Sequence, residues 1–115
     1  MGLFEKTFDW RENLSEQEVS EAIAAAEEMV HRDRFAIGFQ PDAVKKGIRE
    51  RKTALKLLKT KKKLTISEVD LVYNCLRKEA AARQSMGQSR AELSALNELI
   101  SALYKCLWEN RSGGA

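Results

Sequence analysis

The sequence is poor in the residues that interrupt helices. Its 115 residues include one proline and six glycines, and aromatic residues make up only 7% of the chain. Proline and glycine are the strongest helix breakers, so their scarcity favours a chain built mostly from helices. At this length we expect a single domain with a core of its own.

Cysteine and histidine are too few for a disulfide framework or a zinc site. In a hairpin of the last two predicted helices, Cys75 and Cys106 would lie roughly 10 Å apart along the helix axis. A disulfide tolerates a Cα separation of only about 7 Å, so two free, buried thiols are expected. With His31 as the only histidine, the usual ligands of a zinc site are missing as well. We expect no metal and no cofactor.

Long apolar runs are also missing. No window approaches the roughly 18 apolar residues of a membrane-spanning helix. The first ten residues, MGLFEKTFDW, lack the basic start and apolar run of a signal peptide, and Lys6 breaks the myristoylation pattern. The expectation is a cytoplasmic protein with no membrane partner.

Four segments show the apolar spacing of amphipathic helices. Three of them begin with an S/T-x-x-E capping box, at Ser15, Thr65 and Ser89, and Pro41 suits the start of the other. Gly87 is expected to end the third helix in a left-handed conformation. Because short links favour antiparallel neighbours, we predict a compact all-α antiparallel bundle of four main helices. The predicted helices are residues 15–34, 41–59, 65–85 and 89–110.

The last of these segments has the widest apolar arc and is expected to be the central helix. Its apolar side chains cover about half of the helix circumference, more than the roughly 100° of an ordinary surface helix. We place Ile100 at the centre of the core, with Leu96 and Leu103 one turn to either side. The arc consists of Leu93, Leu96, Leu99, Ile100, Leu103, Tyr104, Cys106, Leu107 and Trp108.

The chain is expected to divide into an aromatic arm, one helical-bundle domain and a disordered tail. These parts are residues 1–14, 15–110 and 111–115. The arm lacks the basic face of a membrane anchor, so we expect it to pack on the bundle or on a second copy. In a homodimer, Phe4, Phe8 and Trp10 would be the self-association residues. Residues 35–39, FAIGF, are interpreted as an apolar connector that could be helix, strand or loop.

No catalytic set is recognisable in the sequence. A nucleophile elbow, a phosphate-binding glycine loop and metal-ligand spacing are all missing. His31 lies near the end of a predicted helix, where a histidine more often interacts with the helix dipole than performs catalysis. We therefore predict that the protein is not an enzyme.

The segments LTISEVDLVYNCL and MGQSRAEL resemble the two helices of a helix-turn-helix. Two features depart from that motif. Arg83 stands where the tight crossing needs a small residue, and the supposed recognition helix is apolar over most of its surface. An αα-hairpin, whose link also uses a glycine, is the preferred interpretation.

Charge is distributed very unevenly along the chain. Residues 1–39 hold nine acids and four bases, residues 40–63 hold two acids and ten bases, and residues 64–115 hold six of each. Eight of the bases, which we call the basic stripe, follow one side of the second helix and continue into the next link. They run beside an apolar row expected to face inward, which consists of Val44, Ile48, Leu55 and Leu58 together with Arg51. The stripe consists of Lys45, Arg49, Lys52, Lys56, Lys59, Lys61, Lys62 and Lys63.

The basic stripe is the candidate partner-binding site. It could be a solvated face partly neutralised by the acidic first helix, a site for an acidic protein, or a site for nucleic-acid phosphate. It contains no aromatic residue to stack on single strands and no Asn or Gln to read bases. We therefore predict a small non-enzymatic protein-binding or regulatory module with an acidic protein partner, of a kind that a bacterial or phage source would suit. The alternative is a sequence-independent nucleic-acid-binding protein that uses residues 41–63.

Overall fold

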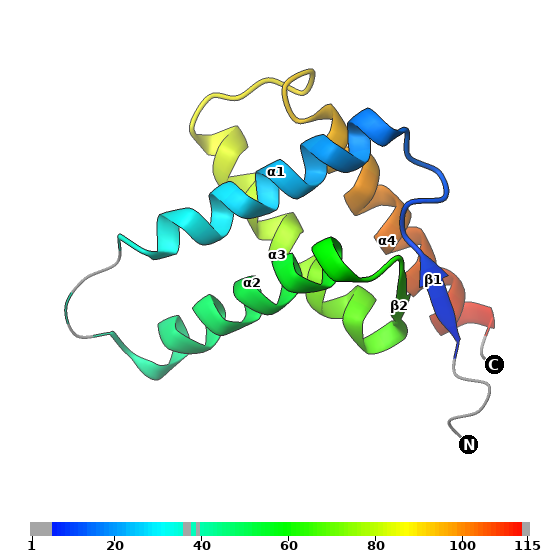
Figure 1. Ribbon diagram of the computed structural model, residues 1–115, viewed down its shortest axis with the longest axis horizontal. Helices are drawn as coiled ribbons and strands as arrows, with labels where there is room; N and C mark the ends of the chain where they lie inside the picture. The colour runs from blue at the N-terminus through cyan, green and yellow to red at the C-terminus, as the bar shows by residue number, and fades with distance from the viewer. Residues whose placement is uncertain (1–5, 36–37, 39, 114–115) are drawn as a thin grey trace.

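The computed structural model describes residues 6–35, 38 and 40–113, with side chains described up to residue 110. Within this part of the chain, four helices and two short strands follow one another (Figure 1). The predicted all-α bundle of four helices is confirmed. The elements are β1 (Thr7–Asp9), α1 (Glu16–Asp33), α2 (Asp42–Thr60), β2 (Lys63–Thr65), α3 (Ile66–Ser85) and α4 (Ser94–Gly113).

Two helical hairpins make up the bundle. α1 and α2 run antiparallel in front of α3 in Figure 1, while α4 packs along α3. α2 also packs on α3 and α1 on α4, so the four helices enclose one core. The C-terminal end of α1 and the N-terminal end of α2 project together at the left of Figure 1.

Side chains at the helix starts bind the backbone N–H groups that have no partner within the helix. Ser15 and Glu18 exchange capping hydrogen bonds of 2.9 and 3.1 Å at the start of α1. Thr65 and Glu68 form the same pair at the start of α3. Gly87 follows the end of α3 with a φ of +95°, as predicted. These two capping pairs and the left-handed glycine therefore form as the sequence predicted.

The last helix differs from its prediction at both ends. Ser89 and Glu92 exchange the expected capping hydrogen bonds, 3.1 and 3.2 Å long. Residues 90–93 nevertheless form a turn, and the regular helix begins at Ser94. At the other end α4 continues to Gly113, where a disordered tail was expected from residue 111. An established helix propagates more easily than a new one starts, which accounts for the extra residues.

A small antiparallel ladder ties the N-terminal segment to the link between α2 and α3, and the sequence analysis did not predict it. Strands of three residues are too short to show an alternating pattern, and these two lie far apart in the sequence. In register, the paired residues are Thr7 with Thr65, Phe8 with Leu64, and Asp9 with Lys63.

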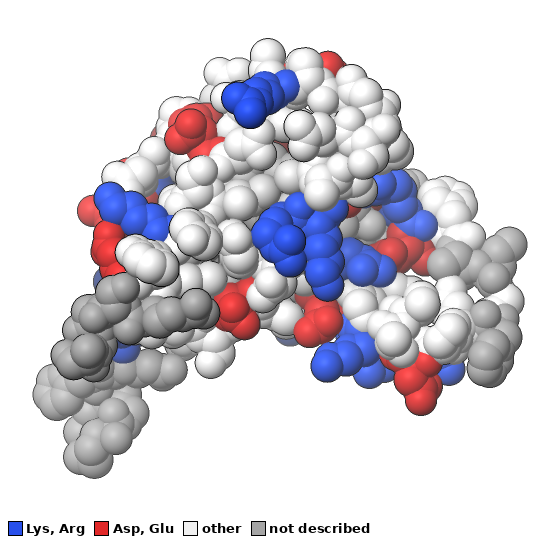
Figure 2. All heavy atoms as spheres, turned by 180° about the vertical axis from the view of Figure 1, so that it is seen from behind, with Lys and Arg blue, Asp and Glu red and all other residues white. Residues whose placement is uncertain are grey.

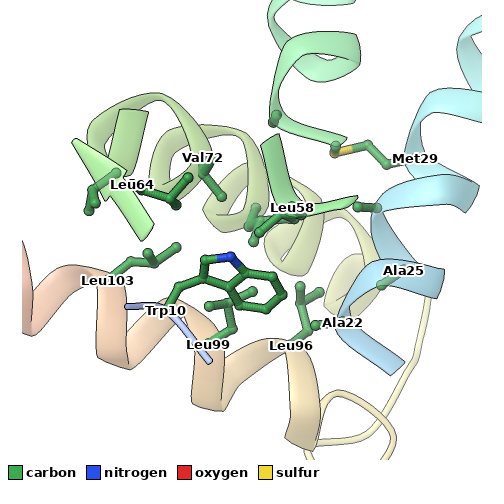
Figure 3. Packing of buried hydrophobic residues seen from close by; sticks show 14 of the residues in the cluster. Trp10, Ala22, Ala25, Met29, Leu58, Leu64, Val72, Leu96, Leu99 and Leu103 are labelled. Atoms are coloured by element: carbon green, nitrogen blue, oxygen red, sulfur yellow. The ribbon is translucent and has the colours of Figure 1, made fainter. Parts of the chain in front are cut away.

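Trp10 lies at the centre of the core. Figure 3 shows its ring among side chains from all four helices and β2, and it is fully buried. Its indole Nε1 donates to the carbonyl oxygen of Lys61 at 2.8 Å. Trp10, predicted to be a self-association residue, thus has its side chain inside its own chain, with no exposed surface for a second copy. Around it pack Ala22, Leu58, Leu64, Val72 and Leu99.

α4 meets the core with a different part of its arc than predicted. Leu99 and Leu103 are fully buried, whereas Ile100 is half-buried at the edge of the core. Tyr104 and Trp108, expected within the arc, are 53% and 56% exposed. The placement of Ile100 at the core centre was wrong. A helical wheel drawn from the sequence shows how wide an apolar arc is, but not which part of the arc a neighbouring helix covers.

Candidate functional site

The basic stripe lies on the side of α2 that faces away from the core. Ala54 and Leu58 are the buried residues of α2, and Arg51 points the same way, toward α1. At 3.6 residues per turn, the stripe positions fall on the opposite side of the helix, and all eight side chains are exposed. Of the apolar row, Leu58 is buried and Leu55 packs half-buried against the core, whereas Val44 at its start is 43% exposed.

Three residues of the stripe have an acidic partner. Lys61 donates to Glu68 at 2.8 Å, and this hydrogen bond is the main reason that the pKa of Glu68 is lowered. The other two contacts are looser, and exposed pairs of this kind contribute little to stability. They are Lys59 with Glu27 and Lys62 with Asp9, each 3.7 Å long.

The remaining five cations of the stripe form no ion pair with any residue that the structure describes. The described ion pairs of α1 that reach α2 go to other cations, since Glu27 pairs with Lys59 and Asp33 with Arg51. Positive charge without an acidic partner thus remains along α2 and at the start of β2. The five are Lys45, Arg49, Lys52, Lys56 and Lys63.

Arg51 joins α2 to α1. Its Nε and Nη2 donate to the carboxylate of Asp33 at 2.7 and 2.9 Å, and this hydrogen bonding raises the pKa of Arg51. Gly47 leaves room for the guanidinium, since a Cβ there would lie 3.1 Å from Nη1. The sequence placed Arg51 on the apolar row, but no local pattern could identify Asp33 as its partner.

A cleft of about 470 Å³ opens between α1, α2 and α3 beside Arg51. Groups of both charges line it, and two of its cations are already bound, Arg51 to Asp33 and Arg32 to Glu79. Cys75 is half-buried in this lining, and burial raises the pKa of its thiol. A thiol held protonated is a weak nucleophile at neutral pH. The ion pairs in the lining of the cleft therefore connect α1 to α2 and α1 to α3.

Buried Glu79 links α3 to α1. Its carboxylate accepts hydrogen bonds from Arg32 and, at 2.6 Å, from Nε of Arg83. Arg83 also donates to Glu28 at 2.6 Å. Arg83 thus fills the helix interface at the position where a helix-turn-helix needs a small residue. The link between α3 and α4, residues 86–93, is also longer than the turn of about 3–4 residues in that motif, which agrees with an αα-hairpin.

His31 lies exposed near the end of α1. Its ring packs edge-to-face against Phe35, with 5.2 Å between the ring centroids. The hollow beside it, of about 300 Å³, is lined by Glu28, Arg32, Arg83, Met86 and Gln88. None of these residues carries a hydroxyl or thiol that His31 could activate. That the protein is not an enzyme stays a prediction.

Of the other two predicted self-association residues, the structure describes only Phe8. Phe8 is half-buried and packs against the core, and Phe4 lies outside the described residues. Most of the connector at residues 35–39 also lies outside them. Among the described side chains, no three His, Cys, Asp or Glu residues come close enough to hold a metal ion. Over the same part of the chain, no helix is long and apolar enough to cross a membrane.

No family model, no curated protein and no solved structure matches this chain. What the protein binds has therefore to be inferred from its own surface.

Proposed function

We propose that this protein is a binding module that holds an acidic protein partner on the outward side of α2. The observation that carries the proposal is the open part of the basic stripe. The stripe residues on α2 are all exposed. Apart from Lys59, which pairs with Glu27, none of them forms an ion pair with a described residue. Like charges three and four residues apart repel by a few tenths of a kcal/mol per pair. Carboxylates of a partner would offset that repulsion.

Two features of the stripe favour a protein over nucleic acid. It has no aromatic side chain for stacking and no amide for contacts with base edges. Four of its five unpaired cations are lysines, whereas arginine is the residue that binds phosphate bidentately. Sequence-independent binding of nucleic acid by residues 41–63 is the second candidate, because ten bases lie within residues 40–63.

The double variant Lys52→Gln, Lys56→Gln tests this proposal. Glutamine and lysine have similar helix propensity, so α2 should stay folded. A matched control, Lys6→Gln with Lys78→Gln, removes the same charge from exposed side chains outside the stripe. Immobilised wild type, variant and control are incubated with an extract of the native host. Retained proteins are identified by mass spectrometry, and retained nucleic acid is sequenced.

The wild type and the control should retain an acidic protein that the variant loses, and the variant should associate with it more slowly. Equal retention by all three proteins would leave the stripe as a solvated face and contradict the proposal. Binding to duplex at about 50 mM salt would favour the second candidate. In that case five phosphate contacts should give a log–log salt slope of roughly −4 to −5, and the double variant should make the slope shallower by about two.

A further inference from the structure

A second surface follows the seam between α3 and α4. These helices lie behind α1 and α2 in Figure 1, so the view from behind in Figure 2 looks onto them. Lys and Arg side chains gather near the middle of this face, with acidic side chains beside them and a large uncharged area above (Figure 2). A groove of about 460 Å³ lies between the two helices. Its polar lining consists of Arg77, Gln84, Arg90 and Asn97, and its small residues are Ala80 and Ala81.

The groove has a single sign of charge. Arg77 and Arg90 are its only charged residues, and no carboxylate lines it. Both arginines are exposed, and neither forms an ion pair with a described residue. The side-chain amides of Gln84 and Asn97 make no hydrogen bond within the described part of the protein either. The groove therefore offers two guanidinium groups and two amides to a ligand.

Aromatic rings continue the groove along the seam, half-buried at Tyr73 and exposed at Tyr104 and Trp108. Tyr73 lies one turn before Arg77 on α3, and Tyr104 lies one turn after Ile100 on α4. The two tyrosine rings are 5.8 Å apart between centroids and tilted by 37°. Trp108 follows one turn further along α4, more than half exposed. Two arginines thus line the groove, and aromatic side chains from both helices follow at one end of it.

We propose that this groove binds single-stranded nucleic acid, with phosphates at Arg77 and Arg90 and bases stacked on Tyr104 and Trp108. Stacking on aromatic rings beside a cationic track is how proteins hold single strands, and arginine pairs with phosphate bidentately. The amides can hydrogen-bond to the exposed edges of unpaired bases. A duplex hides the faces of its bases, and an acidic peptide would use the arginines without stacking on the rings. The proposal is independent of a protein partner on α2.

Fluorescence anisotropy with the full-length protein tests the proposal. The probes are labelled 20-mers of dT and of U, and a labelled duplex, at about 50 mM salt where phosphate contacts are strong. Tyr104→Ala should weaken single-strand binding about tenfold without changing the salt slope, while Tyr104→Phe keeps the ring and should bind like the wild type. Arg77→Gln with Arg90→Gln should make the slope shallower by about 1.4, at about 0.7 per phosphate contact.

A second measurement uses the two tryptophans, which differ in burial. A bound 20-mer should quench the emission of exposed Trp108 and not that of buried Trp10, so Trp108→Phe should abolish the quenching. The proposal is wrong if neither 20-mer binds, if duplex binds as tightly, or if the aromatic and arginine variants all bind like the wild type. It is also wrong if only Lys52→Gln with Lys56→Gln reduces binding, because nucleic acid would then lie on α2. Binding of polyglutamate without binding of the 20-mers would show that the ligand class is wrong.

Discussion

Replacing Trp10 with alanine tests whether the N-terminal segment is part of the core. The ring is fully buried (Figure 3), and truncating a buried tryptophan costs about 3–5 kcal/mol. The variant also loses the hydrogen bond from Nε1 to Lys61, which adds about 1 kcal/mol. We therefore expect the free energy of unfolding to fall by about 4–6 kcal/mol. Domains of this size are stable by about 5–15 kcal/mol, so the loss is a large share of the total.

Urea denaturation followed by circular dichroism measures this loss. At an m-value of about 1.5 kcal/mol per molar urea, a loss of about 4 kcal/mol lowers the midpoint by about 2.5 M. Trp10→Phe keeps most of the ring volume but not the hydrogen bond, so it should lie between the wild type and Trp10→Ala. This variant keeps the measurement possible if the alanine variant does not fold.

Trp108→Ala is the matched control, because the same residue type is 56% exposed on α4. Its free energy of unfolding should stay within about 0.5 kcal/mol of the wild type. If Trp10→Ala were as mild as this control, β1 and Trp10 would not belong to the core. A loss of several kcal/mol in the control would instead refute the exposure of Trp108.

Three further outcomes are expected. Leu99→Ala should lower the free energy of unfolding by about 2–5 kcal/mol and half-buried Ile100→Ala by clearly less; equal losses in urea would contradict the core described here. Glu79→Ala should cost about 3 kcal/mol because two arginines lose a buried partner, and unchanged stability in urea would refute this. The hydrogen bond from Lys61 is the main reason that the pKa of Glu68 is lowered. The ionised carboxylate therefore stabilises the folded protein at pH values above the ordinary carboxyl pKa, and this stabilisation is lost as pH falls through the lowered pKa. Glu68→Gln should therefore flatten the acid side of the stability–pH curve, and an unchanged acid side would argue against the contribution.

Local patterns predicted the helices well because capping and apolar periodicity act within one or two turns. The capping pairs at Ser15, Thr65 and Ser89 all form hydrogen bonds, and Gly87 has the expected positive φ. The predicted starts and ends of the first three helices agree with the structure to one residue. Only α4 departs further, because a turn separates its capping box from the regular helix.

The sides of the helices were harder to assign than their ends. On α2, the large apolar residues indicated one inward side, but small Ala54 is among the fully buried residues of the helix. Small residues allow helices to approach closely, and a periodicity weighted toward large side chains overlooks them. The sequence prediction therefore placed the basic stripe on a flank of α2, whereas in the structure it lies on the outward side of that helix.

The sequence by itself determined the helical class, the helix starts and the uneven distribution of charge, because each depends on residues close together in the chain. Only the tertiary structure decided that Trp10 fills the core, that β1 pairs with β2, and which cations of the stripe stay unpaired. It also brought Tyr73 beside Tyr104 at the edge of a groove lined by arginines from α3 and from the link before α4. These features depend on distances between residues far apart in sequence, which no local pattern contains.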